Sequence, residues 1–337
     1  MIPAKLYIYW KNGRRQILMI KKLLLYLSVL GILIVSNCDG LSLPHSAGRR
    51  DDIIIIVEEE FNTDSLRKVL ERVEYYPSRE EVYRVREFPP ALFNQYQYWR
   101  NLIVIGTYKD DYIDELLSDE AKSSLSTGGG ILSEEDLWVR FQSVVIITGR
   151  DREETQMMIN QYAGVIYLIF RDRERERYEK ILYLDGFEEI KAKEMERLFG
   201  ASYKIPFGYH ISVEGNQFIT YIRKSPDRLV TLLYSNKPIR DPIKFRDSLF
   251  TLHFEGDSVY IPMIVIDTVE FKNETSLRIQ GVWQNNKKVM GGPFISYVFE
   301  KDGIWYFLDG HVFAPGKKKW VYLEEVDIIL STFKKVF

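Results

Sequence analysis

The sequence is short of the residues that would make its chemistry easy to name. Its 337 residues include a single cysteine and four histidines. A single thiol cannot form an intramolecular disulfide. The sequence also has no stretch of the roughly 20 apolar residues that a helix needs to cross a bilayer, because its uncharged stretch at residues 23–35 is only thirteen residues long. These shortages exclude a disulfide-stapled scaffold and argue against a membrane-spanning helix.

Motifs for metals, cofactors and nucleophiles are equally scarce. The histidines at 45, 210, 253 and 311 show neither H-x-x-x-H nor H-E-x-x-H spacing, so a zinc site would have to be assembled from distant residues. The three glycines at 128–130 lack the frame of a dinucleotide or phosphate loop. Ser296 does not stand in a G-x-S-x-G nucleophile elbow. We therefore expect no metal, no cofactor and no recognisable hydrolase triad.

What the sequence does have is an export signal that closes on its only cysteine. Lys21 and Lys22 precede the apolar stretch 23–35, and Val-Ser-Asn-Cys follows at 35–38. A basic segment, a short apolar run and a small-residue cleavage region are typical of a secretory signal. The pattern resembles that of bacterial lipoproteins, which implies that Cys38 accepts a lipid anchor. Asn37 departs from the small residue usual at that place, and the alternative is an ordinary signal with an incidental cysteine.

The translation start and the subcellular location of the protein are expected to follow from this signal. The expected translation start is Met19, with a longer basic signal from residue 1 as the alternative. The chain is then expected in the cell envelope, anchored to the inner or outer membrane and facing the periplasm or the exterior. Asp39 favours inner-membrane retention in some bacteria only, so the membrane is left open. Beyond Cys38 the formal charge is −8, from 40 basic and 48 acidic residues, which argues against nucleic acid as a partner.

The segment patterns predict a tether and two domains. Residues 1–38 are the expected signal, and residues 39–52 are polar and aperiodic like a flexible tether. In residues 53–200, buried-type strands alternate with helices, beginning with five β-branched residues at 53–57, which predicts an α/β layer domain. In residues 201–337, strands follow one another with helices at 243–253 and 320–333. This pattern predicts an α+β domain, an antiparallel sheet sandwiched by helices, one of them C-terminal.

Two segments of the first half carry patterns typical of helices. Residues 64–75 carry an apolar stripe and are predicted as one helix. Residues 171–177 alternate arginine with acidic residues inside a long helix. Such alternation predicts a solvated face whose charges pair with one another.

One candidate binding site lies around residues 290–294. Two glycines and a proline between strands let the backbone turn sharply or be approached closely, and aromatic residues around them could line a groove for a peptide, a glycan or an envelope protein. The alternative is a hairpin connection with ordinary core packing. The candidate residues are Trp283, Gly291, Gly292, Pro293, Phe294, Tyr297, Trp305 and His311.

The same region holds one pair with catalytic potential. Asp309 and His311 are two residues apart in a predicted strand, so their side chains are expected on one face. The pair could act as an orienting acid and a base. The alternative is a hydrogen-bonded structural histidine, and because no nucleophile accompanies the pair, we expect no catalytic residue here.

Several segments together resemble an uncharacterised bacterial lipoprotein family, domain of unknown function 4837, over most of residues 50–335. The segments are Arg-Asn at 100–101, Ile-Pro-Phe-Gly-Tyr at 205–209, Gly-Val-Trp at 281–283, Met-Gly-Gly-Pro-Phe-Ile-Ser-Tyr at 290–297 and Gly-His-Val-Phe-Ala-Pro at 310–315. The resemblance implies an anchored envelope protein and no assigned reaction. The second half is also similar to the PsbP and Mog1 type of α/β/α sandwich, whose members are mostly binding or assembly modules.

The sequence thus favours an exported, membrane-anchored lipoprotein that acts as a non-catalytic binding or assembly factor of the bacterial cell envelope. One alternative is an envelope hydrolase or transferase with its site near His311 and Asp309. Another is a structural spacer.

Overall fold

A computed structural model describes residues 5–7, 43–76, 78–125, 128–254, 256–285 and 287–336. Cys38 and residues 23–35 lie outside these ranges, so lipidation at Cys38 stays a prediction. Among the helices described, none is both long and apolar enough to span a membrane. The chain forms two compact units: unit 1 is Met1–Glu71 with Tyr83–Phe170, and unit 2 is Arg72–Val82 with Arg171–Phe337.

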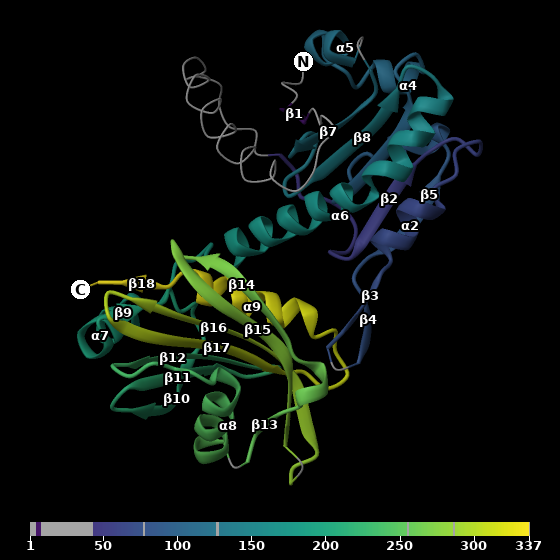
Figure 1. The fold of residues 1–337 in the computed structure, drawn as a ribbon. Coiled ribbons are helices and arrows are strands. Elements are labelled where there is room, and N and C mark those ends of the chain that lie inside the picture. Colours follow the sequence, from purple (N-terminus) through teal and green to yellow (C-terminus); the bar gives the residue numbers. More distant parts are fainter. Residues whose placement is uncertain are drawn as a thin grey trace, which may run out of the picture. The chain divides into compact units, whose positions relative to one another are not determined.

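Unit 1 is built on a six-stranded mixed sheet in the order β1-β7-β8-β6-β2-β5 (Figure 1). Four strands are parallel, and β7 and β1 add antiparallel pairs at one side. The strands are β1 (Lys5–Tyr7), β2 (Asp52–Ile56), β5 (Arg84–Phe88), β6 (Asn101–Thr107), β7 (Gly130–Glu135) and β8 (Ser143–Gly149). Strand β1 lies upstream of Met19, the expected start. The predicted alternation of strands and helices is confirmed.

The parallel strands are apolar because helices cover both faces of a sheet of this kind. Residues Asp52–Ile56 are buried throughout, and alternate positions of β2 and β6 pack into one cluster with the short helices α4 and α5. The helices of unit 1 are α2 (Asp64–Leu70), η1 (Pro90–Leu92), α3 (Phe93–Tyr96), α4 (Asp111–Asp114), α5 (Asp119–Leu125) and the part of α6 (Arg152–Leu182) up to Phe170.

The helix predicted over residues 64–75 is shorter than expected. It ends at Leu70, and the backbone then forms β3 (Val73–Tyr75), which pairs with β4 (Arg79–Glu81) in an antiparallel hairpin. The β-branched Val73 favours a strand over a helix, and the hairpin belongs to unit 2 rather than unit 1.

Unit 2 is built on an eight-stranded sheet whose pairs are all antiparallel (Figure 1). Its order is β10-β11-β12-β17-β16-β15-β13, and β14 also pairs with β15. The strands are β10 (His210–Gly215), β11 (Phe218–Arg223), β12 (Asp227–Ser235), β13 (Ser258–Val259), β14 (Val265–Phe271), β15 (Glu274–Asn285), β16 (Met290–Lys301) and β17 (Ile304–Phe313).

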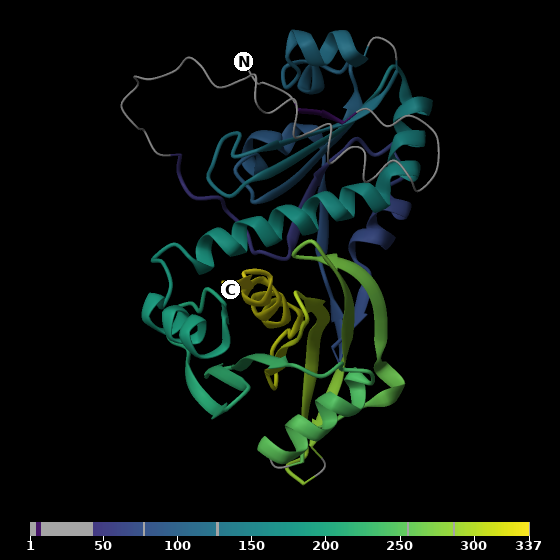
Figure 2. The ribbon, with the colours of Figure 1, turned by 60° about the vertical axis from the view of Figure 1, so that its left-hand side comes forward.

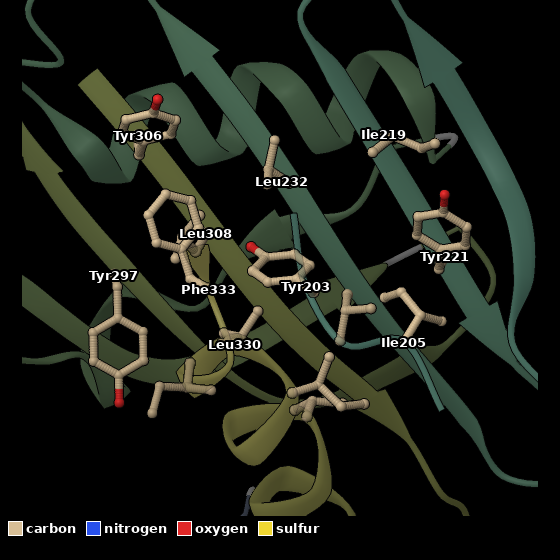
Figure 3. Close-up of a cluster of buried hydrophobic side chains, with 14 of the residues drawn as sticks. Tyr203, Ile205, Ile219, Tyr221, Leu232, Tyr297, Tyr306, Leu308, Leu330 and Phe333 are labelled. Carbon is tan, nitrogen blue, oxygen red and sulfur yellow. The ribbon is translucent and has the colours of Figure 1, made fainter. Parts of the chain in front are cut away.

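Helices cover both faces of this sheet, which confirms the predicted α/β sandwich (Figure 2). On one face, α7 (Glu189–Phe199) and the C-terminal α9 (Trp320–Ser331) bury a cluster that includes Tyr203 and Leu308 (Figure 3). On the other, α8 (Pro242–His253) packs over a cluster that includes Phe294 and Phe307. The remaining elements are η2 (Ile261–Met263) and the pair of β9 (Ala201–Ser202) with β18 (Lys334–Lys335).

The units divide inside helix α6, between Phe170 and Arg171, earlier than the boundary expected near residue 200. From Arg171 onward the helix contacts α9 of unit 2: Arg175 Nη1 lies 2.6 Å from Asp327 Oδ2. The prediction of a solvated, self-paired face at residues 171–177 is therefore wrong in part. Glu174 and Arg177 do pair with each other but are buried, and Arg175 pairs across to another helix.

Candidate functional site

A buried polar network lies on the α8 face of the unit 2 sheet and is centred on Asp309 of β17. Ser296 of β16 stands directly opposite Asp309 in the ladder, and its hydroxyl donates to Asp309 Oδ2 at 2.6 Å. Arg246 of α8 donates from Nε to the same oxygen at 2.8 Å. His311 Nδ1 lies 2.9 Å from Asp309 Oδ1. Three elements of the sandwich thus converge on one carboxylate.

The predicted proximity of Asp309 and His311 is confirmed, because strand alternation puts both side chains on the same face. Sequence reasoning missed Arg246, which lies 63 residues away on a helix. The only sequence signal was a basic residue in the helix predicted over residues 243–253. Its guanidinium lies between two aromatic rings, 3.8 Å from the centroid of Phe294 and 4.4 Å from that of Phe250.

The electrostatics of the network keep Asp309 ionised. Complete burial alone would raise the pKa of this carboxyl group. The charge of Arg246 and the hydrogen bond from His311 outweigh that effect and lower the pKa to about 2. Asp309 is therefore a buried anion at neutral pH, and Arg246 supplies its counter-charge.

The hydroxyl of Ser296 contacts the carboxylate of Asp309 and not the imidazole of His311. Ser296 Oγ donates to Asp309, so the order of contacts is serine to aspartate to histidine. A nucleophilic triad needs the serine next to the histidine. The imidazole itself packs edge-on against Phe250, Phe254 and Trp283, with centroid distances of 4.9, 5.9 and 5.8 Å. The network is built to hold His311 and Arg246 in place.

A cavity of about 300 Å³ opens next to His311. We call it the His311 cavity. Its lining residues are Ser212, Val213, Ile222, Lys224, Asp227, Leu229, His253, Phe254, Asp257, Trp283, Lys288, Met290, His311 and Phe313. Within the described residues His311 Nε2 has no hydrogen-bond partner, and no group of three or more His, Cys, Asp or Glu side chains is arranged to hold a metal ion.

A sharp turn at Gly291, Gly292 and Pro293 is wrong, because all three residues lie inside β16, whereas the close approach expected as the other reading is found at Gly292. Gly292 pairs with Trp283 and Pro293 with Val282 in the ladder to β15. Pro293 is tolerated because pairing of β16 with β17 extends only to Phe294. A Cβ at Gly292 would stand 1.9 Å from the carbonyl oxygen of Val312. Glycine is needed here for the close approach of two strands.

The structure separates the predicted aromatic set. Trp283 and His311 line the His311 cavity, and Phe294 packs behind them against Arg246. Tyr297 lies three residues after Phe294, so it faces the other side of the sheet, where its hydroxyl donates to Asp327 at 2.7 Å. Trp305 packs in the cluster of the α8 face but does not line the cavity.

We predict that Gly292→Ala lowers the stability of unit 2. The clash is with backbone, so a neighbouring rotamer cannot relieve it, and forced overpacking costs about 1–3 kcal/mol or more. Hydrogen exchange of the β16 and β17 amides measures the loss. Gly164→Ala in α6 is the control, because a Cβ there meets nothing within 4 Å and alanine favours a helix. Unchanged protection of β16 in Gly292→Ala would contradict the prediction.

Comparison with family models divides the chain in two. Residues 46–183 match Domain of unknown function (DUF8532), and residues 188–332 match Domain of unknown function (DUF4837). The predicted similarity to DUF4837 is confirmed, but it covers the second half and not most of residues 50–335. No curated protein matches the chain.

Three solved structures match part of the chain at low identity. CyanoP, the cyanobacterial PsbP of Synechocystis sp. PCC 6803, has 8% identity and a TM-score of 0.28, and the match covers 41% of this chain and 87% of that one. LpqN, described as involved in cell envelope biogenesis of Mycobacterium tuberculosis, has 10% identity and a TM-score of 0.27, with coverage of 40% and 82%.

The third is a structure from Bacteroides thetaiotaomicron VPI-5482, with 11% identity and a TM-score of 0.27. The match covers 41% of this chain and 46% of that one, so it spans about half of the other protein's length. By these comparisons the first half of the chain is similar to the DUF8532 family and the second half to the DUF4837 family.

Proposed function

We propose that the protein is an exported, lipid-anchored binding factor of the bacterial cell envelope, without catalytic activity, and that its ligand binds in the His311 cavity. The observation that carries the proposal is the arrangement around Asp309. The carboxylate is occupied by Arg246 and Ser296, while the His311 ring borders a cavity of about 300 Å³. A cavity of this size with aromatic walls and a few fixed polar groups is typical of a ligand site.

Support for the anchor comes from the sequence at Cys38, where basic residues, an apolar stretch and a cysteine follow in order. More than one acyl chain is needed for durable attachment to a bilayer, and a processed lipoprotein cysteine supplies them. Mass spectrometry of the mature N-terminal peptide tests this part. An acylated peptide beginning at Cys38 supports the proposal, and a mature N-terminus that lacks Cys38 overturns it.

Binding at the cavity is tested with a variant that fills it. Met290 lines the cavity and is half-buried, so Met290→Trp is expected to occupy the space without disturbing the ladder. Detergent-solubilised full-length protein is used to capture envelope components, and each component is quantified by mass spectrometry. We expect the specific component to be lost with Met290→Trp and retained with Lys287→Trp, an exposed position of the same hairpin that does not line the cavity.

Identical capture by wild type and Met290→Trp would remove the cavity from the proposal. Such a result would favour a structural spacer, which needs no ligand site.

One observation favours a hydrolase or transferase as the second candidate. The imidazole of His311 borders the cavity and has a carboxylate 2.9 Å from Nδ1, as an oriented general base would. Incubation of the protein with peptidoglycan fragments and envelope peptides distinguishes the two functions. Products formed by the wild type but not by a folded His311→Gln variant would establish the enzyme and refute the non-catalytic proposal.

A further inference from the structure

We propose that the His311 cavity recognises a primary alkylammonium group, such as the side chain of a lysine residue or a similar amine. This inference rests on the proposed function, because it names the chemistry of the ligand that the cavity would bind. Its basis is that the buried polar atoms of the cavity are hydrogen-bond acceptors, one of which carries a negative charge.

The first acceptor is Asp257. Its side chain lines the cavity, and the residue is only 9% exposed. Its Oδ1 accepts a hydrogen bond of 2.7 Å from the amide of Asn285, and its backbone carbonyl accepts from Thr251. Among the described residues no lysine, arginine or histidine forms an ion pair with Asp257. Because a buried carboxylate is costly without a cation, this site favours a ligand that brings one.

The second acceptor is His311 Nε2. Asp309 is ionised and faces Nδ1, so Nδ1 donates the hydrogen bond between them. Arg246 already balances the charge of Asp309. In the neutral tautomer with its proton on Nδ1, the ring presents the Nε2 lone pair, which can accept a hydrogen bond from a donor on the ligand.

The third feature is the C-terminal end of helix α8, which carries a partial negative charge. His253 is the last residue of the helix, Phe254 follows it, and both line the cavity. The carbonyl end of a helix carries a partial negative charge and stabilises cations. The aromatic walls, which include Trp283 and Phe254, are also compatible with a cation, since a ring face attracts positive charge.

The lining also includes two lysines, whose side chains are exposed while Asp257 is buried. Lys224 and Lys288 are both exposed, and Lys224 Nζ is paired with Asp227 Oδ2 at 2.9 Å.

The test compares two probes that differ in the amine alone. Isothermal titration of the detergent-solubilised full-length protein is performed with Nα-acetyl-lysine and with Nα-acetyl-norleucine, which lacks the ammonium group. We expect Nα-acetyl-lysine to bind about tenfold more tightly or better, as charge-assisted hydrogen bonds allow. Equal binding of the two probes would overturn the inference, and this comparison needs no variant.

Variants locate the effect. Asp257→Asn is expected to abolish the preference for Nα-acetyl-lysine and to leave the affinity for Nα-acetyl-norleucine unchanged. The matched control is Asp267→Asn, which alters a carboxylate of the same sheet that lies outside the cavity and is paired with Arg278. We expect the control to keep the preference within about twofold, as for exposed ion pairs. A preference retained in folded Asp257→Asn would refute the role of Asp257.

The two proposals fail separately. If neither probe binds but Met290→Trp still abolishes capture of an envelope component, the ammonium inference is wrong and the binding function stands. If Met290→Trp changes nothing in capture, the binding function itself fails.

Discussion

Replacement of Asp309 by alanine is expected to lower the free energy of unfolding of unit 2 by about 3–5 kcal/mol, the range for breaking one partner of a buried ion pair. Asp309 is fully buried and Arg246 is 1% exposed, so the variant leaves a guanidinium in the interior without its counter-ion. Ser296 and His311 lose their partner at the same time. Attraction by two aromatic rings does not replace a carboxylate.

The matched control for this variant lies in the same sheet. Asp267 of β14 pairs with Arg278 of β15 at 2.8 Å, the same distance as the Arg246–Asp309 pair. Both partners are partly exposed to water, so Asp267→Ala is expected to cost less than about 1 kcal/mol. Urea unfolding, together with hydrogen exchange of the β16 and β17 amides, compares the stability losses of the two variants. Equal losses would contradict the role of burial.

A double variant separates charge from packing. Arg246→Met with Asp309→Leu removes both ions, and buried ion pairs replaced by apolar residues are often neutral or stabilising. We expect it to regain most of the stability that Asp309→Ala loses. A double variant as unstable as the single one would show that the loss comes from cavity formation and not from the unpaired charge.

The depressed pKa of Asp309 gives the same variant a signature in acid. A carboxyl group whose pKa falls from its ordinary value to about 2 on folding stabilises the fold fully above the unfolded value of about 3.9. This contribution is lost as the pH falls through the folded value. Wild-type stability should therefore drop between about pH 4 and pH 2, and the difference between wild type and Asp309→Ala should shrink over the same interval.

Structural features that depend on residues close together in the chain were predicted from local periodicity. The contact of Asp309 with His311 follows from alternation along one strand, and the buried strand at residues 53–57 follows from its β-branched composition. The order of secondary structures also predicted the α/β layer of unit 1 and the antiparallel sandwich of unit 2, but not the antiparallel strands β7 and β1. Each of these predictions depends on the local sequence alone and not on which distant segments are in contact.

Features that depend on distant segments were missed. Arg246 reaches Asp309 from a helix 63 residues away, and neither pattern in isolation indicates the other. Gly291 and Gly292 indicated either a turn or a close approach, and nothing local reveals that Val312 is the residue that comes close to Gly292. Asp257 follows the end of α8, and no sequence pattern singled it out. Its place in the His311 cavity depends on strands from both halves of the unit 2 sheet.

The separation of Tyr297 from Phe294 has a different cause, because local reasoning could have found it. Two residues three positions apart in a strand face opposite sides. Parity along β16 therefore assigns Phe294 to the α8 face and Tyr297 to the α9 face, as observed. Aromatic composition alone does not define a groove, and parity has to be applied before residues are grouped.

The α9 face of the unit 2 sheet has its own buried carboxylate, and the second large effect is expected there. Glu325 of α9 is 1% exposed. It accepts hydrogen bonds from Tyr178 at 2.6 Å, from Tyr209 at 2.9 Å and from Arg228 at 3.0 Å. One side chain thus joins helix α6, the segment before β10 and strand β12 to helix α9.

Glu325→Ala is expected to lower the free energy of unfolding of unit 2 by about 3–5 kcal/mol. Arg228 is only 6% exposed, and without Glu325 its charge is left in the interior. Burial together with the charge of Glu325 raises the pKa of Tyr209 well above its ordinary value, so this phenol stays protonated and loses its acceptor. Hydrogen exchange of the α9 and β12 amides reports the loss.

The control is Glu189→Ala in α7, a carboxylate whose pair with Lys193 is exposed on both sides and worth a few tenths of a kcal/mol, about 0.5 at most. A conservative variant separates charge from hydrogen bonding: Glu325→Gln keeps an oxygen for the two tyrosines and removes the negative charge. If Arg228 is the main source of the loss, Glu325→Gln should be nearly as unstable as Glu325→Ala. If the tyrosine hydrogen bonds dominate, Glu325→Gln should recover most of the stability, and the ion pair would be a minor contributor to the α9 packing.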